Sequence, residues 1–217
     1  MTACDLKPMN LEQTVFGDED AALRSTHAPL SLEASPLGST TYGISLGSNL
    51  GDRLAHLQRG LGDVLRNAPG THLVAAGAVY ETAPVGCPPG SLNFYNSVVE
   101  IASPLAPHAM YAVLQNVEKT HGRPDERERN APRPLDLDIL YAGELRLDDD
   151  TLTVPHPRLH IRRFVLQPLA DIRPNRLIPG LARTVAELLA GLADNPMEVQ
   201  RVTTGWTEVP VVKEVAN

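Results

Sequence analysis

The sequence predicts an α+β fold, a mostly antiparallel sheet with helices packed on one face. The main observation is the order of the apolar segments along the chain, which is strand, helix, strand, strand, helix, strand. Apolar residues recur at strand-like spacing in residues 42–46, 72–80, 93–102 and 135–140. A second observation is that the chain lacks a glycine-rich phosphate loop and a dinucleotide fingerprint. This absence excludes several common nucleotide-binding folds.

The first strand ends at Gly47-Ser48-Asn49, where Ser48 or Asn49 is suited to cap the helix that follows. Leucine and valine repeat at helical spacing from Leu50 to Leu65. Gly60 and Gly62 each weaken this helix by roughly 1 kcal/mol relative to alanine. We therefore expect packing against a neighbouring surface to sustain it.

The third strand and the second helix also follow from side-chain spacing. In residues 93–102, Phe94 and Asn96 share one face of a strand. Pro107 begins a helix that ends at Gly122, with Gln115 and Glu118 together off its apolar stripe, facing either solvent or a cleft. A last helix is predicted around residues 185–192.

Length and composition bound the class of protein. With 217 residues and 42% hydrophobic content, the chain predicts one main domain over residues 40–195. We expect a flexible N-terminal extension over 1–39 and a loosely held C-terminal tail over 196–217. A net charge of −7 argues against a general nucleic-acid-binding protein. Two distant cysteines and no apolar run near 18 residues argue against a disulfide framework and a membrane span, and favour the cytoplasm.

The most informative segment is an arginine-rich loop, residues 123–133, that runs into the strand Leu135-Asp136-Leu137-Asp138-Ile139-Leu140. Alternation places Asp136 and Asp138 on one face and the aliphatic side chains on the other. Two adjacent carboxylates favour a hard cation such as Mg²⁺ between them. Pro132 and Pro134 hold Arg133 in an extended segment. Because guanidinium groups bind phosphate oxygens, the segment predicts a Mg²⁺-nucleotide site.

Each part of this pattern is weak alone, because alternating acids and Arg/Glu-rich loops are common on solvated surfaces. Two other functions fit the Asp-x-Asp pattern: a metal-dependent glycosyltransferase and a catalytically inactive nucleotide-binding module. The first requires an open groove for its sugar acceptor. The second would release no product from ATP.

Taken together, the motifs resemble the 6-hydroxymethyl-7,8-dihydropterin pyrophosphokinase family of folate biosynthesis. The similarity covers residues 41–195 and is carried by the signature segment 129–140 and by several separated motifs. These motifs are Gly47 to Asp52, Tyr80 to Pro84, Glu118 to Arg123, and Val154-Pro155-His156 with Arg162 and Phe164. The resemblance implies a ferredoxin-like sandwich. It also implies transfer of pyrophosphate from ATP to 6-hydroxymethyl-7,8-dihydropterin, with release of AMP. We expect no nucleic acid, membrane or obligate protein partner.

The resemblance also implies roles for individual residues. Asp136 and Asp138 would hold two Mg²⁺ ions, and the catalytic arginines Arg123 and Arg133 would clamp phosphate oxygens. The residues expected around ATP are Gln115, Glu118, Ile139, Thr153, His156 and Arg162. Those expected around the pterin are Thr82, Ala83, Val85, Phe94, Asn96 and Phe164.

The chain departs from the family pattern at three positions. Asn130 stands where relatives often carry an aromatic residue, and Asp125 and Thr151 stand where they often carry basic residues. These departures predict a weaker or differently built loop closure and ATP clamp. The sequence indicates no general base for the pterin hydroxyl, and Mg²⁺ could acidify that group directly.

Overall fold

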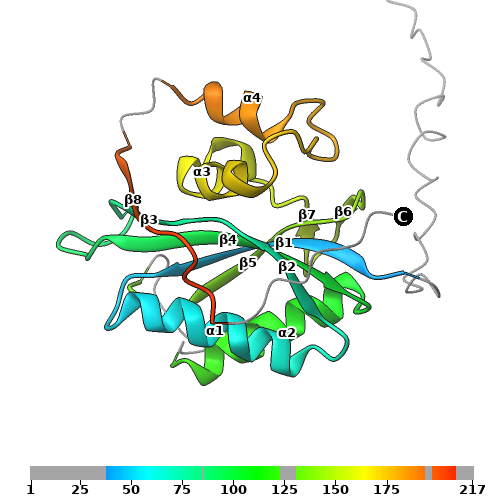
Figure 1. The fold of residues 1–217 in the computed structure, drawn as a ribbon, viewed down its shortest axis with the longest axis horizontal. Coiled ribbons are helices and arrows are strands. Elements are labelled where there is room, and N and C mark those ends of the chain that lie inside the picture. Colours follow the sequence, from blue (N-terminus) through cyan, green and yellow to red (C-terminus); the bar gives the residue numbers. More distant parts are fainter. Residues whose placement is uncertain (1–37, 85, 123–130, 194–196, 209–217) are drawn as a thin grey trace, which may run out of the picture. The chain divides into compact units, whose positions relative to one another are not determined.

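The structure is a computed structural model that describes residues 38–84, 86–122, 131–193 and 197–208. These residues form a six-stranded sheet with the order β5-β1-β4-β3-β8, in which β2 also pairs with β4 (Figure 1). All pairings are antiparallel. The strands are β1 (Thr40–Ser48), β2 (His72–Ala76), β3 (Val79–Thr82), β4 (Phe94–Ser103), β5 (Asp136–Ala142) and β8 (Val199–Thr203). The predicted fold class, an antiparallel sheet with helices on it, is confirmed.

Two helices cover one face of the sheet, α1 (Arg53–Asn67) and α2 (Pro107–Thr120) (Figure 1). Their apolar stripes pack with Ile44, Leu137 and Ile139 in the larger of the two cores. Gly60 explains part of this contact, because a Cβ atom added there would lie 2.6 Å from Leu135 Cδ2. The expectation that packing sustains this glycine-containing helix is therefore confirmed.

The opposite face is covered by α3 (Arg163–Ile172) and α4 (Val185–Ala190), so the expectation of helices on one face only is wrong (Figure 1). A second core joins Val98 and Leu140 of the sheet to Leu166 and Leu169 of α3. Between the two layers, β4 is buried over most of its length, although Asn96, Ser97, Glu100 and Ser103 make its sequence only partly apolar.

The predicted strand 72–80 is two strands, because Gly77 interrupts it. A Cβ atom at Gly77 would lie 2.3 Å from the carbonyl oxygen of Pro168 in α3. The Gly77 carbonyl accepts hydrogen bonds from Ser97 Oγ at 3.0 Å and from Trp206 Nε1 at 2.8 Å. The strand therefore breaks where the backbone of α3 approaches the sheet most closely.

Residues 197–208 belong to the sheet and its core, which corrects the expectation of a loosely held tail for this part of the chain. The strand β8 pairs with β3, and the Trp206 side chain is only 4% exposed. Burial of a large indole with a satisfied N–H is strongly stabilising. Most of the predicted N-terminal extension lies outside the described residues.

The remaining elements connect the layers. The short strands β6 (Leu147–Asp148) and β7 (Thr153–Val154) form a two-stranded sheet, and Leu159–Ile161 forms a single 3₁₀ turn. The N-cap of α1 is Asp52, whose carboxylate accepts from Ala55 N, rather than the predicted Ser48 or Asn49. Among the described residues, no helix has both the length and the apolar character needed to cross a bilayer.

Candidate active site

The two predicted metal ligands lie on the face of β5 that α3 covers. Leu137 lies between the two aspartates and Ile139 follows them. Each is 3% exposed and points into the α1/α2 core, as the alternation predicted. The Asp138 side chain is 39% exposed, and that of Asp136 is 19% exposed. The carboxylates thus share a face at the edge strand of the sheet, where Asp138 in particular is open to solvent.

Arg133 lies directly against Asp136. Its Nη2 atom donates to Asp136 Oδ2 at 2.7 Å, and its guanidinium carbon lies 5.6 Å from the centroid of the Phe94 ring. Asn49 fixes the main chain of Arg133, because Asn49 Oδ1 accepts from Arg133 N at 2.8 Å. The Nε atom of Arg133 is buried and has no hydrogen-bond partner among the described residues. A guanidinium with a spare donor beside a carboxylate is suited to bind an additional anion.

A second cationic group approaches Asp138 from the segment before α3. Arg162 Nη1 lies 3.6 Å and His156 Nε2 lies 3.9 Å from Asp138 Oδ2. Burial, followed by the charges of Arg162 and Arg158, lowers the pKa of His156 to about 4. His156 is therefore neutral at pH 7, and its contact with Asp138 is not an ion pair. His156 Nδ1 accepts from Arg158 N at 3.0 Å, and Nε2 lies 3.4 Å from Arg162 Nη1.

Three of the predicted pterin-pocket residues lie together where β3 and β4 pair. Asn96 Nδ2 donates to Thr82 Oγ1 at 2.7 Å, and Phe94 pairs with Thr82 across the strands. All three are buried. The side chain of Phe164 lies under the guanidinium of Arg162, with 5.5 Å between that carbon and the ring centroid.

Gly47 on β1 lies between Asp136 and the pterin-pocket residues Phe94 and Asn96. A Cβ atom built there would lie 3.1 Å from Asn96 Oδ1, 3.7 Å from Asp136 Cβ and 3.8 Å from Phe94 Cδ1. The absence of a side chain at Gly47 thus leaves Asn96, Phe94 and Asp136 around one point. The Gly47-Ser48-Asn49 motif was noted in the sequence as a helix start and as part of the family resemblance, but not as part of the site.

Other predicted residues are placed less directly. Glu118 is 6% exposed and accepts from Leu137 N at 2.8 Å, so it faces the edge of the carboxylate strand rather than solvent. Ile139 has its side chain in the core, and only its main chain could contact a nucleotide. Gln115 and Ala83 are exposed, and Thr153 Oγ1 donates to Asp148 Oδ1 at 2.8 Å. Arg123 and Val85 lie outside the described residues.

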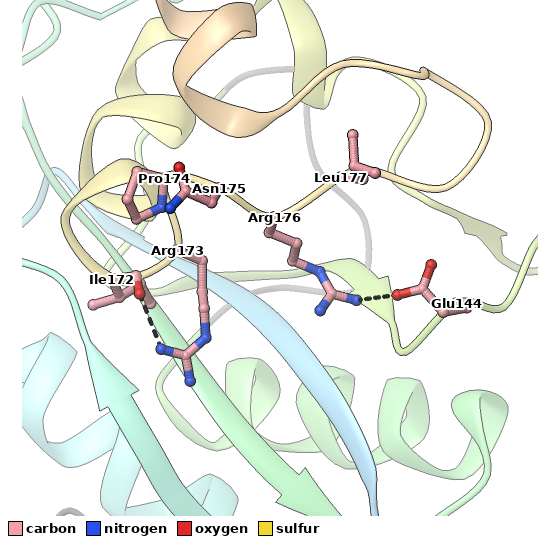
Figure 2. A pocket seen from close by; sticks show the side chains of 7 residues that line it. All are labelled: Glu144, Ile172, Arg173, Pro174, Asn175, Arg176 and Leu177. Atoms are coloured by element: carbon pink, nitrogen blue, oxygen red, sulfur yellow. Dashed lines mark hydrogen bonds and ion pairs between the residues drawn. The ribbon is translucent and has the colours of Figure 1, made fainter.

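A surface cavity of about 520 Å³ lies elsewhere, between the loop after α3 and Glu144 (Figure 2). Its two arginines are held by protein groups. Arg173 pairs with the buried Glu100, and Arg176 pairs with Glu144 at 3.3 Å while it stacks on Tyr141. None of the predicted site residues lines this cavity, and we do not assign the site to it.

The fold and the site define an α+β protein with a site of mixed acidic and basic charge at one end of an antiparallel sheet. The profile of the 7,8-dihydro-6-hydroxymethylpterin-pyrophosphokinase (HPPK) family matches residues 43–174, more than half of the chain. The chain therefore belongs to the HPPK family.

Individual proteins agree with this assignment. The chain is 41% identical over 147 residues to the 2-amino-4-hydroxy-6-hydroxymethyldihydropteridine pyrophosphokinase of Pseudomonas aeruginosa, covering 68% of this chain and 88% of that protein. It is 43% identical over 129 residues to the mitochondrial folate synthesis bifunctional protein of Pisum sativum, covering 59% of this chain and 24% of that protein. The chain thus spans about a quarter of the length of the plant relative.

A crystal structure of Plasmodium falciparum HPPK-DHPS has the same fold. Its TM-score is 0.57 at 13% sequence identity, and the match covers 77% of this chain and 45% of that chain. At this identity, the likeness extends to the fold alone.

Proposed function

We propose that this chain transfers the β,γ-pyrophosphoryl group of ATP to the hydroxymethyl oxygen of 6-hydroxymethyl-7,8-dihydropterin and releases AMP. Family membership supports the reaction. The single observation that supports the location of the substrate site is the position of Asp136. Asp136 contacts Arg133 on one side and, across Gly47, lies beside Asn96 and Phe94. The charged groups suited to a triphosphate thus meet the aromatic and amide groups suited to a flat ring.

The residues present fit Mg²⁺. Among the described residues, no group of three or more His, Cys, Asp or Glu side chains could hold a metal. Mg²⁺ is commonly bound by one or two carboxylates together with substrate phosphates, which is what Asp136 and Asp138 offer. When bound, Mg²⁺ would neutralise charge on the triphosphate.

The side chains of this protein supply positioning and electrostatic stabilisation. Arg133 and Arg162 each lie within 4 Å of one of the two carboxylates and can bind phosphate oxygens bidentately. His156 is neutral at pH 7, and a pKa of about 4 makes it too weak a base to take a proton from the substrate. Asn96 offers a donor and an acceptor to the amide edge of a pterin, and Phe94 offers an apolar surface.

A coupled assay for AMP tests this proposal. The expected result is AMP release that requires ATP, Mg²⁺ and the hydroxymethyl-dihydropterin together. AMP formation without the pterin, or none with all three, would contradict the proposal. The second outcome would instead favour an inactive nucleotide-binding protein.

A further inference from the structure

Arg53 occupies an electrostatically unfavourable position. It is the first residue of α1, and the first turn of that helix contains no acidic residue. The N-terminal end of a helix carries partial positive charge from its unpaired N–H groups, so a cation there is destabilising. The carboxylate of the preceding Asp52 already accepts from Ala55 N. The guanidinium of Arg53 is therefore expected to gain its stabilisation outside the helix.

The side chain of Arg53 makes three contacts with the β3–β4 hairpin. Its Nη1 atom donates to Glu81 Oε1 and to the carbonyl oxygen of Asn93, both at 2.8 Å. Its guanidinium carbon lies 3.7 Å from the centroid of the Tyr95 ring. One planar cation thus binds both strands, in a combination that lysine cannot reproduce.

These contacts lie where the connection between β3 and β4 leaves and re-enters the sheet. Glu81 pairs with Tyr95, and the next pair, Thr82 with Phe94, is the last one of the hairpin. Tyr95 packs against the α1/α2 core, so by strand alternation Phe94 and Asn96 face the opposite side. Arg53 therefore contacts the hairpin on the α1/α2 face of the sheet. The pterin ring would bind on the opposite face, which Phe94 and Asn96 share.

We propose that Arg53 is a positioning residue for the pterin. It fixes the two strand ends at Glu81 and Asn93 and thereby sets the spacing of Thr82, Phe94 and Asn96 for a flat bicyclic substrate. This inference rests on the proposed function and deepens it. We expect the effect to be on the pterin rather than on ATP, because Arg53 contacts Glu81, Asn93 and Tyr95. The hydrogen-bonding groups of Arg133 and Arg162 lie instead against Asp136 and Asp138.

The test compares Arg53→Met with Arg59→Met in the full-length chain. Met keeps most of the aliphatic stem but removes the charge and the stacking, and Arg59 is an exposed arginine of the same helix. For Arg53→Met, we expect KM for the hydroxymethyl-dihydropterin to rise about tenfold, the effect of losing one charge-assisted hydrogen bond. KM for ATP should stay unchanged. Arg59→Met should leave both constants unchanged.

Two further variants separate positioning from general stability. Arg53→Lys should give an intermediate KM for the pterin, and it serves as the main variant if Arg53→Met does not fold. Glu81→Gln should raise KM for the pterin alone, but add little in the Arg53→Met background, because both changes remove the same contact.

The outcomes are distinguishable. A wild-type chain that releases no AMP would overturn the proposed function and this inference with it. An active wild type in which Arg53→Met raises both KM values equally would overturn only the inference. An Arg53→Met variant with a lowered melting temperature but an unchanged KM for the pterin would also overturn only the inference.

Discussion

Asn49 holds the main chain of Arg133 through its side-chain oxygen and its own main-chain N–H. Asn49 Oδ1 accepts from Arg133 N at 2.8 Å, and Asn49 N donates to Arg133 O at 3.2 Å. The amide nitrogen of the same side chain donates to Leu92 O at 3.4 Å. Asn49 is completely buried. The residue expected to cap a helix therefore links the arginine segment to the start of β4.

Asn49→Ala is expected to weaken both stability and activity. The substitution removes the acceptor of Arg133 N, and a donor left unsatisfied away from water costs about 1–3 kcal/mol. We expect the free energy of unfolding in urea to fall by about that amount, and kcat to fall because Arg133 loses its orientation. Asn175→Ala, at an exposed position, is the control. Wild-type stability in Asn49→Ala would contradict the structural role.

Asp138→Ala is expected to leave the fold intact and to abolish turnover. Its side chain is 39% exposed, and substitutions at such positions usually change stability by less than about 1 kcal/mol. If Asp138 binds Mg²⁺, kcat should fall by orders of magnitude, measured as AMP release at saturating substrates. Asp150→Ala, in an exposed acidic turn, should remain active. Near-normal activity of Asp138→Ala would rule out the metal assignment.

Gly47→Ala is expected to block the ring-binding side while the protein stays folded. The new Cβ would lie 3.1 Å from Asn96 Oδ1, closer than most real Cβ contacts, and 3.8 Å from Phe94 Cδ1. We expect the dissociation constant for the pterin, measured by calorimetry, to rise about tenfold or more. Gly38→Ala, with nothing within 4 Å of the added atom, is the matched control. Unchanged pterin affinity would place the ring elsewhere.

Acidification is expected to destabilise the protein through His156. Its folded pKa of about 4 lies below its ordinary value of 6.5, so between these pH values the unfolded chain binds more protons. Stability contributed by the neutral ring is present above pH 6.5 and is lost as the pH falls toward 4. The full difference amounts to about 3 kcal/mol.

Urea unfolding of wild type and His156→Gln at pH 7.5, 6 and 5 measures this effect. The wild type should lose more stability than His156→Gln over this range. His72→Gln, at the start of β2, where His72 pairs with Ala102 at the end of β4 remote from Phe94, should follow the wild type. Identical pH profiles for wild type and His156→Gln would mean that His156 is not desolvated in solution.

Some tertiary features left a signal in the sequence without being predictable from it. Gly60 and Gly77 break local preferences, and each permits a close approach, by Leu135 and by the Pro168 carbonyl. A glycine in a helix or strand indicates such an approach but does not name its partner. The second covering layer left no such signal, because β4 carries polar residues among its apolar ones and α3 comes much later in the chain.

The sequence by itself determined the alternation of strands and helices up to β5, apart from the break at Gly77, as well as the start of α2 at Pro107 and the common face of Asp136 and Asp138. These features depend on residues within a few positions of one another, where backbone periodicity decides the outcome. Only the tertiary structure decided that α3 covers the second face, that β8 extends the sheet, and that Arg162 and His156 approach Asp138. Such contacts join segments far apart in the chain, and packing rather than local spacing selects them.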